Sequence, residues 1–244
     1  MKYATVFLML MILSVSASPI LADVFPTLSS IDDVILLGGS PLHIPLDGFD
    51  GDGDTLAFTA SSNDPALVST FIPTGNRSMR ISVAGFGDMV FELFENRAPR
   101  VTDRIITLAQ SGFYDGVSFH RVMDDFMIQG GDPTGTGSGG STLGDFDDQF
   151  HADLQHNGSG VLSMAKSGDD TNDSQFFITE VPTRWLDYNH SIFGQLIEGE
   201  DVRQAISNVP VGGTTPLTPV IMDSVTIFTD NENGVLMLKA PEGA

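Results

Sequence analysis

The chain has 244 residues, of which 32 are acidic and 11 are Lys or Arg, so its formal net charge is -21. This balance argues against nucleic acid and anionic membranes as partners, because both would repel the protein. The sequence contains no cysteine, which excludes disulfides, thiol catalysis and cysteine-ligated metals.

Residues 1–22 have the pattern of a secretory signal peptide. Lys2 gives a positive start, an apolar run follows at 6–15, and small residues lead to a cleavage point at Ala22. The run is too short for a comfortable transmembrane helix, and it lacks the amphipathic pattern of a buried N-terminal helix. We therefore expect an exported protein that is periplasmic, cell-surface or extracellular, with no membrane span in the mature chain.

Residues 23–85 predict a small β module. Short apolar or alternating runs are separated by Gly, Pro, Asp and Asn: DDVILLGG, PLHIPLDGF, TLAFTASS, ALVSTFIP and SMRISVAG. Five short strands at this spacing are typical of a small β-sandwich or part of one. The stretch loosely resembles the immunoglobulin- or cadherin-like modules of secreted bacterial proteins.

One turn of this module, DGFDGDGD at 47–54, is a weak candidate for a calcium site. It contains four carboxylates, those of Asp47, Asp50, Asp52 and Asp54. Alternating carboxylates can surround Ca²⁺, although Thr55 and Ser61 stand where an EF-hand needs Gly and Glu. The same residues are also typical of an acidic, solvated turn between strands. Both interpretations stay open.

From residue 86 the pattern changes to a mainly β domain with two helices. The strand-like run DMVFELFENRAP ends at a proline, and helical spacing follows over 100–112 with Gly112 as a stop. A second helix is predicted over 199–208, where acidic residues in the first turn favour the helix dipole. Nearly everything between the helices reads as strand and loop, which predicts a closed or nearly closed antiparallel barrel.

Two features of this region predict no ligand. The glycine run GTGSGG at 135–140 is interpreted as a plain loop, because no helix pattern begins there and no Lys-Ser/Thr pair follows. The five histidines are scattered, with no i, i+4 pair on a helix, which argues against a zinc site.

Four blocks in this region occur in a characteristic order: VFELFENRAP, GFYDGVSFHRVMDDFMIQGGDPTGTGSGG, GVLSMAKSGDDTNDSQFFIT and WLDYNHSIFGQLIEG. Together they resemble the cyclophilin-type peptidyl-prolyl cis–trans isomerases, over about residues 86–228. The resemblance implies an eight-stranded antiparallel barrel capped by two helices, here over 86–229. It also implies an isomerase (rotamase) that needs no metal or cofactor and acts on proline-containing polypeptides.

The resemblance also implies an active face on the outside of the barrel. Its catalytic residues would be Arg121, Phe126 and Gln129. Its substrate-binding residues would be Met127, Ala165, Lys166, Gln175, Phe177, Trp185, Leu186 and His190. Phe126, Met127, Phe177 and Leu186 would line an apolar pocket for the proline ring, whereas His120 is interpreted as structural, with its ring bonded within the fold.

The chemistry explains why an arginine stands among apolar residues in SFHRVMDDFMIQGGD at 118–132. An Xaa–Pro bond isomerises over a barrier of about 18–20 kcal/mol, and the prolyl nitrogen regains a lone pair only as the bond loses its double-bond character. A donor aimed at that nitrogen binds the transition state better than the planar ground state. A guanidinium can donate without transferring a proton, so Arg121 is the predicted donor.

Three residues depart from the common family pattern: Lys166, Ser167 and Asp173 replace the usual Asn, Ala and Gly. The first acts largely through its backbone, whereas the other two alter the groove's rim and polarity. Trp185 favours binding of cyclosporin-type inhibitors, although the short loop before SFHR leaves their tight binding open. We expect a monomer.

A second hypothesis is a non-catalytic module that binds proline-containing segments, with the β region mediating adhesion. The set of Arg121, Phe126 and Gln129 favours the enzyme, because a pure binder needs no donor at the prolyl nitrogen. Residues 230–244 form a C-terminal extension, either an extra edge strand or the stub of a further module. The boundary near residue 85 also stays open, because one strand of RISVAGFGDMVFEL could run into the next domain without a linker.

Overall fold

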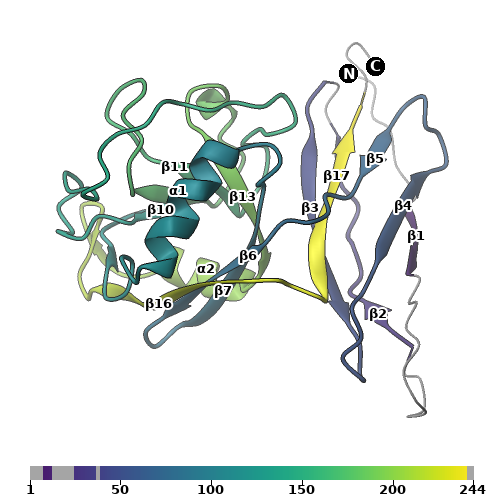
Figure 1. Ribbon diagram of the computed structural model, residues 1–244, viewed down its shortest axis with the longest axis horizontal. Helices are drawn as coiled ribbons and strands as arrows, with labels where there is room; N and C mark the ends of the chain where they lie inside the picture. The colour runs from purple at the N-terminus through teal and green to yellow at the C-terminus, as the bar shows by residue number, and fades with distance from the viewer. Residues whose placement is uncertain (1–7, 13–24, 37–38, 241–244) are drawn as a thin grey trace. The chain divides into compact units, whose positions relative to one another are not determined.

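The structure, a computed structural model, describes residues 8–12, 25–36 and 39–240 (Figure 1). The chain divides into two compact units, Met1–Gly75 with Thr229–Ala244, and Asn76–Phe228. This division differs from the predicted boundaries at both ends of the barrel. Residues 76–85 belong to the barrel unit, and the C-terminal extension belongs to the N-terminal unit.

The barrel unit is built on one antiparallel sheet of nine strands. They are β6 (Ser78–Val83), β7 (Gly87–Leu93), β8 (Ser118–Phe119), β9 (Arg121–Met123), β10 (Met127–Gly130), β11 (Val161–Met164), β12 (Phe176–Thr179), β13 (Ile192–Glu198) and β16 (Val220–Phe228). Their order is β8-β16-β6-β7-β13-β11-β12-β10-β9. Strand β6 pairs with β7 on one side and β16 on the other, which explains why it belongs to the barrel.

The first and last strands of this sheet are neighbours in sequence. Only His120 separates β8, which pairs with β16, from β9, which pairs with β10. A bridge between Ser118 of β8 and Asp132, just after β10, adds a further link across the gap. The sheet is therefore nearly closed, and the count of nine instead of the expected eight reflects the interruption at His120.

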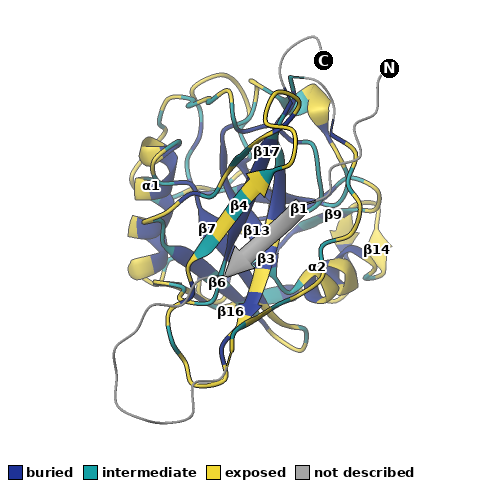
Figure 2. Cartoon of the chain, turned by 90° about the vertical axis from the view of Figure 1, so that its right-hand side faces the viewer, coloured by how far each residue is buried: buried dark blue, intermediate teal, exposed yellow. Residues whose placement is uncertain are grey.

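Two α-helices confirm the helical predictions, α1 (Pro99–Gln110) and α2 (Glu200–Ser207). Pro99 at the start of α1 lacks the N–H that would be unsatisfied there. Residues spaced at helical intervals, such as Val101 and Ile105, are buried, so α1 presents one face to the core and the other to solvent (Figure 2). A 3₁₀-helix, η1 (Arg184–Leu186), and a hairpin of β14 (Val211–Gly212) and β15 (Thr215–Pro216) complete the unit.

The N-terminal unit contains two small sheets. One has the order β2-β3-β17-β5, with β2 (Thr27–Leu28), β3 (Leu42–Phe49), β17 (Asn233–Lys239) and β5 (Ser69–Phe71). The other pairs β1 (Leu8–Ile12) with β4 (Phe58–Ser62). The C-terminal strand β17 lies between β3 and β5 (Figure 1) and is thus a central strand of this unit. Its Leu236 and Leu238 join Ile44 and Leu46 of β3 in a buried apolar cluster.

Not every predicted strand of this module formed as expected. Residues 32–36, within DDVILLGG, have no regular secondary structure, and SMRISVAG supplies β6 of the barrel. A sandwich of the immunoglobulin or cadherin kind stays a prediction. The predicted signal peptide lies outside the described residues apart from Leu8–Ile12, and it also stays a prediction. No helix in the described part of the chain is long and apolar enough to span a membrane.

The acidic turn at 47–54 is held by its own backbone. The Asp50 carboxylate accepts backbone N–H groups of Asp52, Gly53 and Asp54, and Asp47 accepts the Ser29 hydroxyl. In the described ranges, no three His, Cys, Asp or Glu side chains form a group that could hold a metal ion. The geometry therefore favours the turn over the calcium site.

Candidate active site

Strand register aligns the central residues of the predicted face. Arg121 of β9 lies opposite Gln129 of β10, which lies opposite Phe177 of β12, which in turn lies opposite Ser163 of β11. Directly opposed residues of antiparallel strands point to the same side of a sheet. The barrel therefore places the guanidinium, the amide and the aromatic ring in one row, although the sequence separates them widely.

The Arg121 guanidinium is held by neutral acceptors. Its Nη1 donates to Gln129 Oε1 at 3.0 Å, and its Nη2 donates to Met123 Sδ at 3.0 Å. The described residues include no carboxylate that forms an ion pair with it. Every other arginine of the chain has such a partner at 3.9 Å or less: Arg77, Arg80, Arg97, Arg100, Arg104, Arg184 and Arg203. Arg121 thus keeps its charge unneutralised at this face.

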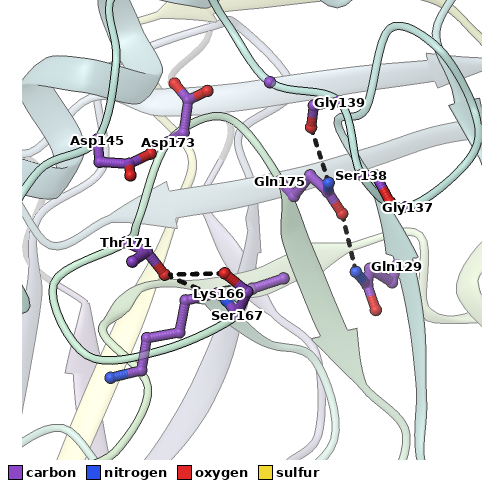
Figure 3. A pocket seen from close by; sticks show the side chains of 12 residues that line it. Gln129, Gly137, Ser138, Gly139, Asp145, Lys166, Ser167, Thr171, Asp173 and Gln175 are labelled. Carbon is purple, nitrogen blue, oxygen red and sulfur yellow. Dashed lines mark hydrogen bonds between the residues drawn. The ribbon is translucent and has the colours of Figure 1, made fainter.

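A chain of amides extends this network away from Arg121. Gln129 Nε2 donates to Gln175 Oε1 at 3.0 Å, and Gln175 Nε2 donates to the carbonyl of Gly139 at 2.8 Å (Figure 3). The backbone of Ala165 is fixed beside them, because its N–H donates to the Gln175 carbonyl at 2.9 Å. Both glutamines are therefore oriented before any ligand arrives.

Aromatic residues from three parts of the chain, at positions 126, 177 and 185–190, form the apolar part of the face. The Phe177 ring meets the His190 ring edge-on at 5.5 Å, and Phe126 faces Trp185 at 5.8 Å. Phe177 and Met127 are 4% and 1% exposed, so they form the floor of this surface, whereas Trp185 is 66% exposed on η1. Leu186, also on η1, is partly buried. These are the residue types that a proline ring needs as a wall and floor.

His190 and His120 differ in their surroundings. His190 Nδ1 lies 2.9 Å from the carbonyl of Met164, and burial lowers the pKa of His190. Burial likewise lowers the pKa of His120. The expected bond of the His120 ring within the fold stays a prediction. The backbone of Ser118 acts on the ring in the direction of a hydrogen bond, although neither ring nitrogen has a hydrogen bond of normal geometry to the described residues. The direction of both shifts favours neutral imidazoles near neutral pH.

A polar cavity of about 430 Å³ lies beside the glutamines (Figure 3). Its lining includes Lys166, Ser167, Thr171, Asp145 and Asp173. The Lys166 ammonium is not available to a ligand, because it donates to Asp148 at 2.5 Å and Asp169 at 3.2 Å. Burial alone would lower the pKa of Lys166, but these carboxylates outweigh it and raise the pKa, so the ion pair persists.

Asp173, which departs from the family pattern, is built into the wall of the cavity. It forms an ion pair with Arg104 of α1 at 3.0 Å and accepts the backbone N–H of Ser141 at 2.5 Å. A side chain at Gly140 would clash with this carboxylate, since a Cβ there would lie 2.0 Å from Asp173 Oδ2. Asp173 therefore connects the loop at 140–141 to α1.

The glycine run belongs to a loop, residues 132–140, that wraps around its own carboxylate; we call it the glycine loop. Asp132 Oδ2 accepts the backbone N–H groups of Thr136, Gly137 and Gly139, and Oδ1 accepts both donors of Thr134. Only glycine fits at Gly139, where a Cβ would lie 2.1 Å from Asp132 Oδ1. Burial would raise the pKa of Asp132, yet these bonds outweigh it and lower the pKa. The N–H groups thus bind Asp132 instead of a phosphate.

Sequence comparison decides the family. The family model described as cyclophilin type peptidyl-prolyl cis-trans isomerase/CLD matches residues 78–227, more than half of the chain. The chain belongs to the cyclophilin-type peptidyl-prolyl cis-trans isomerases. It is therefore an enzyme of that class, as the four sequence blocks predicted.

Individual cyclophilins agree with this assignment. The chain is 56% identical over 118 residues to peptidyl-prolyl cis-trans isomerase ppi1 of Schizosaccharomyces pombe, covering 48% of this chain and 76% of that protein. It is 52% identical over 126 residues to a peptidyl-prolyl cis-trans isomerase-like 1 protein of Neurospora crassa, covering 51% and 77%. A crystal structure of a Cryptosporidium parvum cyclophilin matches with a TM-score of 0.61 and 37% identity, covering 64% of this chain and 99% of that one.

Two polar residues behind the cyclophilin face were not anticipated from the sequence. His156 stacks on Phe177, and Asp187 directly follows Leu186 and bonds to His156. Asp187 lies within the recognised block WLDYNH, so the sequence signal for a site residue was present there. His156 lies between blocks, and only the folded chain brings it to Phe177.

Proposed function

We propose that this isomerase acts on proline-containing segments of exported polypeptides, and that Arg121 donates a hydrogen bond to the prolyl nitrogen in the transition state. The proline ring lies on the apolar floor of Phe126, Met127, Phe177 and Leu186. Gln129 and the backbone near Lys166 hold the flanking peptide groups. A crystal structure of the Cryptosporidium parvum cyclophilin was obtained in the presence of the dipeptide Ala-Pro, which supports this class of substrate.

One observation carries the proposal, namely that both hydrogen-bond partners of Arg121 in the described part of the chain are neutral. A carboxylate partner would occupy the guanidinium and lower the energy of the free enzyme, so it would oppose donation to a ligand. Gln129 and Met123 instead orient the fork and leave its charge uncompensated. A charge-assisted hydrogen bond contributes about 1.5–3 kcal/mol, which corresponds to about 10- to 150-fold in rate.

The remaining acceleration comes from the apolar surroundings and from orientation. An apolar floor disfavours the charge-separated form that keeps the amide planar. Anchoring the proline ring while the acyl side rotates adds an orientation effect. Neither effect requires a nucleophile, a metal or a cofactor.

The test is the cis-to-trans rate of an Ala-Pro-Phe peptide with the wild type and the variant Arg121→Ala. We expect kcat/KM to fall by about 100-fold, equivalent to about 2.7 kcal/mol, while the melting temperature changes little. The kcat/KM of Arg121→Lys should lie between those of the wild type and Arg121→Ala, because lysine keeps the charge but lacks the planar fork of N–H donors. Arg100→Ala, which removes a half-exposed arginine of α1, is the control.

Equal rates for the wild type and Arg121→Ala would overturn the proposed mechanism. A folded wild type that binds the peptide without accelerating its isomerisation would instead favour the non-catalytic binding module.

The exported context rests on residues 1–22 alone. Mass spectrometry of the full-length chain expressed in a secreting bacterial host should show a protein that begins after Ala22 in the periplasm or medium. An unprocessed chain that stays in the cytosol would contradict export without affecting the proposed mechanism.

A further inference from the structure

A buried polar cluster lies behind the proline floor; it consists of Asp187, His156 and Ser163, and we call it the His156 cluster. His156 Nδ1 lies 3.1 Å from Asp187 Oδ1, and His156 Nε2 lies 3.0 Å from Ser163 Oγ. The backbone N–H of His156 donates to the same Asp187 oxygen at 2.6 Å. The mechanism proposed above uses none of these three residues.

The cluster has the residue types of a nucleophilic triad, but its burial excludes that role. Ser163 and His156 are both 0% exposed. A substrate carbonyl could not approach Ser163 Oγ without unfolding this side of the barrel, because the neighbouring Phe177 ring and strands cover it. The cluster must therefore act on the protein itself.

The bonding pattern fixes the orientation of the imidazole. An ionised carboxylate can only accept hydrogen bonds, so His156 Nδ1 carries the proton that faces Asp187. At the opposite edge of the ring, His156 Nε2 and Ser163 Oγ share a hydrogen bond. Burial would raise the pKa of Asp187, but the bonds from His156 and Arg184 outweigh it and lower the pKa, which keeps this acceptor ionised. Both edges of the ring are thus held.

The fixed imidazole lies flat against the floor of the proline site. The rings of His156 and Phe177 are stacked, with centroids 5.8 Å apart and planes only 12° from parallel. Ser163 lies directly opposite Phe177 across the β11–β12 ladder. Phe177 is therefore held from behind by His156 and met at its edge by His190.

The same cluster also fixes the wall of the proline site. Asp187 directly follows η1, which carries Trp185 and Leu186. The backbone N–H of Thr183, just before η1, donates to the carbonyl of His156 at 2.8 Å. His156 is thus bonded to the residues just before and just after η1, and its ring also stacks on Phe177 of the floor.

We propose that His156 is a positioning residue of the isomerase, which fixes Phe177 and η1 relative to each other so that the proline ring meets a preformed surface. This inference rests on the proposed proline site, because it concerns residues that act through Phe177 and Trp185. It predicts a defect in peptide binding that is larger than the loss of stability explains.

The main test variant is His156→Phe, which keeps a flat ring behind Phe177 and removes both side-chain hydrogen bonds. Trp185 is the only tryptophan of the chain, so its fluorescence reports peptide binding at η1. We expect the peptide affinity of the full chain to fall about 10-fold, KM to rise similarly, and kcat to change less. Asp187→Asn keeps an oxygen for both His156 donors and should stay within about threefold of the wild type.

The control for lost stability is Thr102→Val, which removes a buried hydroxyl that bonds to the carbonyls of Ala98 and Pro99 in α1. It should lower the melting temperature without changing the peptide affinity. Wild-type affinity and KM in a folded His156→Phe would overturn the proposal, as would an equal loss of affinity in Thr102→Val.

A second variant keeps the test decisive if His156→Phe does not fold. Asp187→Ala removes the acceptor for His156 and should weaken peptide binding about as much, whereas wild-type binding by Asp187→Ala would overturn the proposal. Failure of the proposed function gives a different result, because it would leave the rate of Arg121→Ala unchanged whatever the His156 variants do to binding.

Discussion

Arg121 and Asp132 flank β10 in sequence, yet their charges have opposite surroundings. The Asp132 carboxylate accepts three backbone N–H groups at one oxygen and both donors of Thr134 at the other. The Arg121 guanidinium has two neutral partners, Gln129 and Met123. One charge is saturated by the protein and the other is only oriented by it.

This difference indicates which of the two charges serves the stability of the barrel and which serves its function. A saturated buried charge holds a loop in place, because each of its donors would be unsatisfied without it. An oriented but uncompensated charge retains binding energy for a ligand. The two regions are coupled, since the glycine loop supplies the Gly139 carbonyl that holds Gln175.

The largest effect that this comparison predicts is on stability. Asp132→Asn replaces an ionised acceptor with an amide whose NH₂ faces the donors of the glycine loop. We expect the free energy of unfolding at pH 7 to fall by about 2–3 kcal/mol, since bonds to a charged group are strong and unpaired donors are costly. Denaturant unfolding measures the loss, and kcat/KM of the folded variant should change less than threefold.

Asp223→Asn, at an exposed position of β16, is the matched control and should leave both quantities unchanged. A loss of activity above 10-fold in Asp132→Asn would break the separation, because it would show that the glycine loop acts in catalysis as well as in folding.

The stability difference between the wild type and Asp132→Asn should depend on pH. The folded-state pKa of Asp132 is lowered, so its contribution is complete above the unfolded pKa of about 4 and is lost as the pH falls towards the folded value. The two proteins should therefore become more alike in unfolding free energy between about pH 4 and pH 2. A difference that stays constant across this range would mean that the charge of Asp132 is not the cause.

The substitution Gln129→Glu would compensate the charge of Arg121, as the donors around Asp132 compensate the charge of that carboxylate. The new carboxylate would form an ion pair with Arg121, so less of its charge would remain for the prolyl nitrogen. We expect kcat/KM at pH 7 to fall about 10-fold, equivalent to about 1.4 kcal/mol, with little loss of stability. Gln204→Glu, on the exposed side of α2, adds the same charge as a control. Unchanged kcat/KM in Gln129→Glu would show that the neutral partners of Arg121 do not matter for catalysis.

The two regions also differ in how far they could be predicted from the sequence. The residues aligned with Arg121 lie in recognisable blocks, so their identity was predictable, and the barrel register then placed them in one row. The glycine run was predicted as a plain loop, because no helix pattern begins there and no Lys-Ser/Thr pair follows. No local pattern indicated that its N–H groups bind the Asp132 carboxylate of the same loop. His156 and Asp187 pair across distant segments, and no local pattern indicates such a contact.

The C-terminal strand β17 shows the same limit in the other unit. Its run GVLMLKA predicted a strand, but strand partners depend on contacts between distant segments. The run is apolar on both faces, and residues 234–238 are all buried. Continuous apolar runs are typical of strands covered on both sides, so this pattern favours an interior strand over an edge strand.

The smallest effect that the comparison predicts is that of Trp185→Phe. Trp185 is mostly exposed, carries no charge and faces Phe126 at 5.8 Å, and phenylalanine keeps an aromatic face there. We expect kcat/KM to change by threefold or less, which a peptide isomerisation assay with the wild type in parallel can resolve. Trp185→Ala should lose somewhat more, because it removes the wall itself. If Trp185→Phe instead lost as much activity as Gln129→Glu, the apolar wall would contribute as much as the unneutralised charge of Arg121, and the contrast with Asp132 would no longer explain where the binding energy resides.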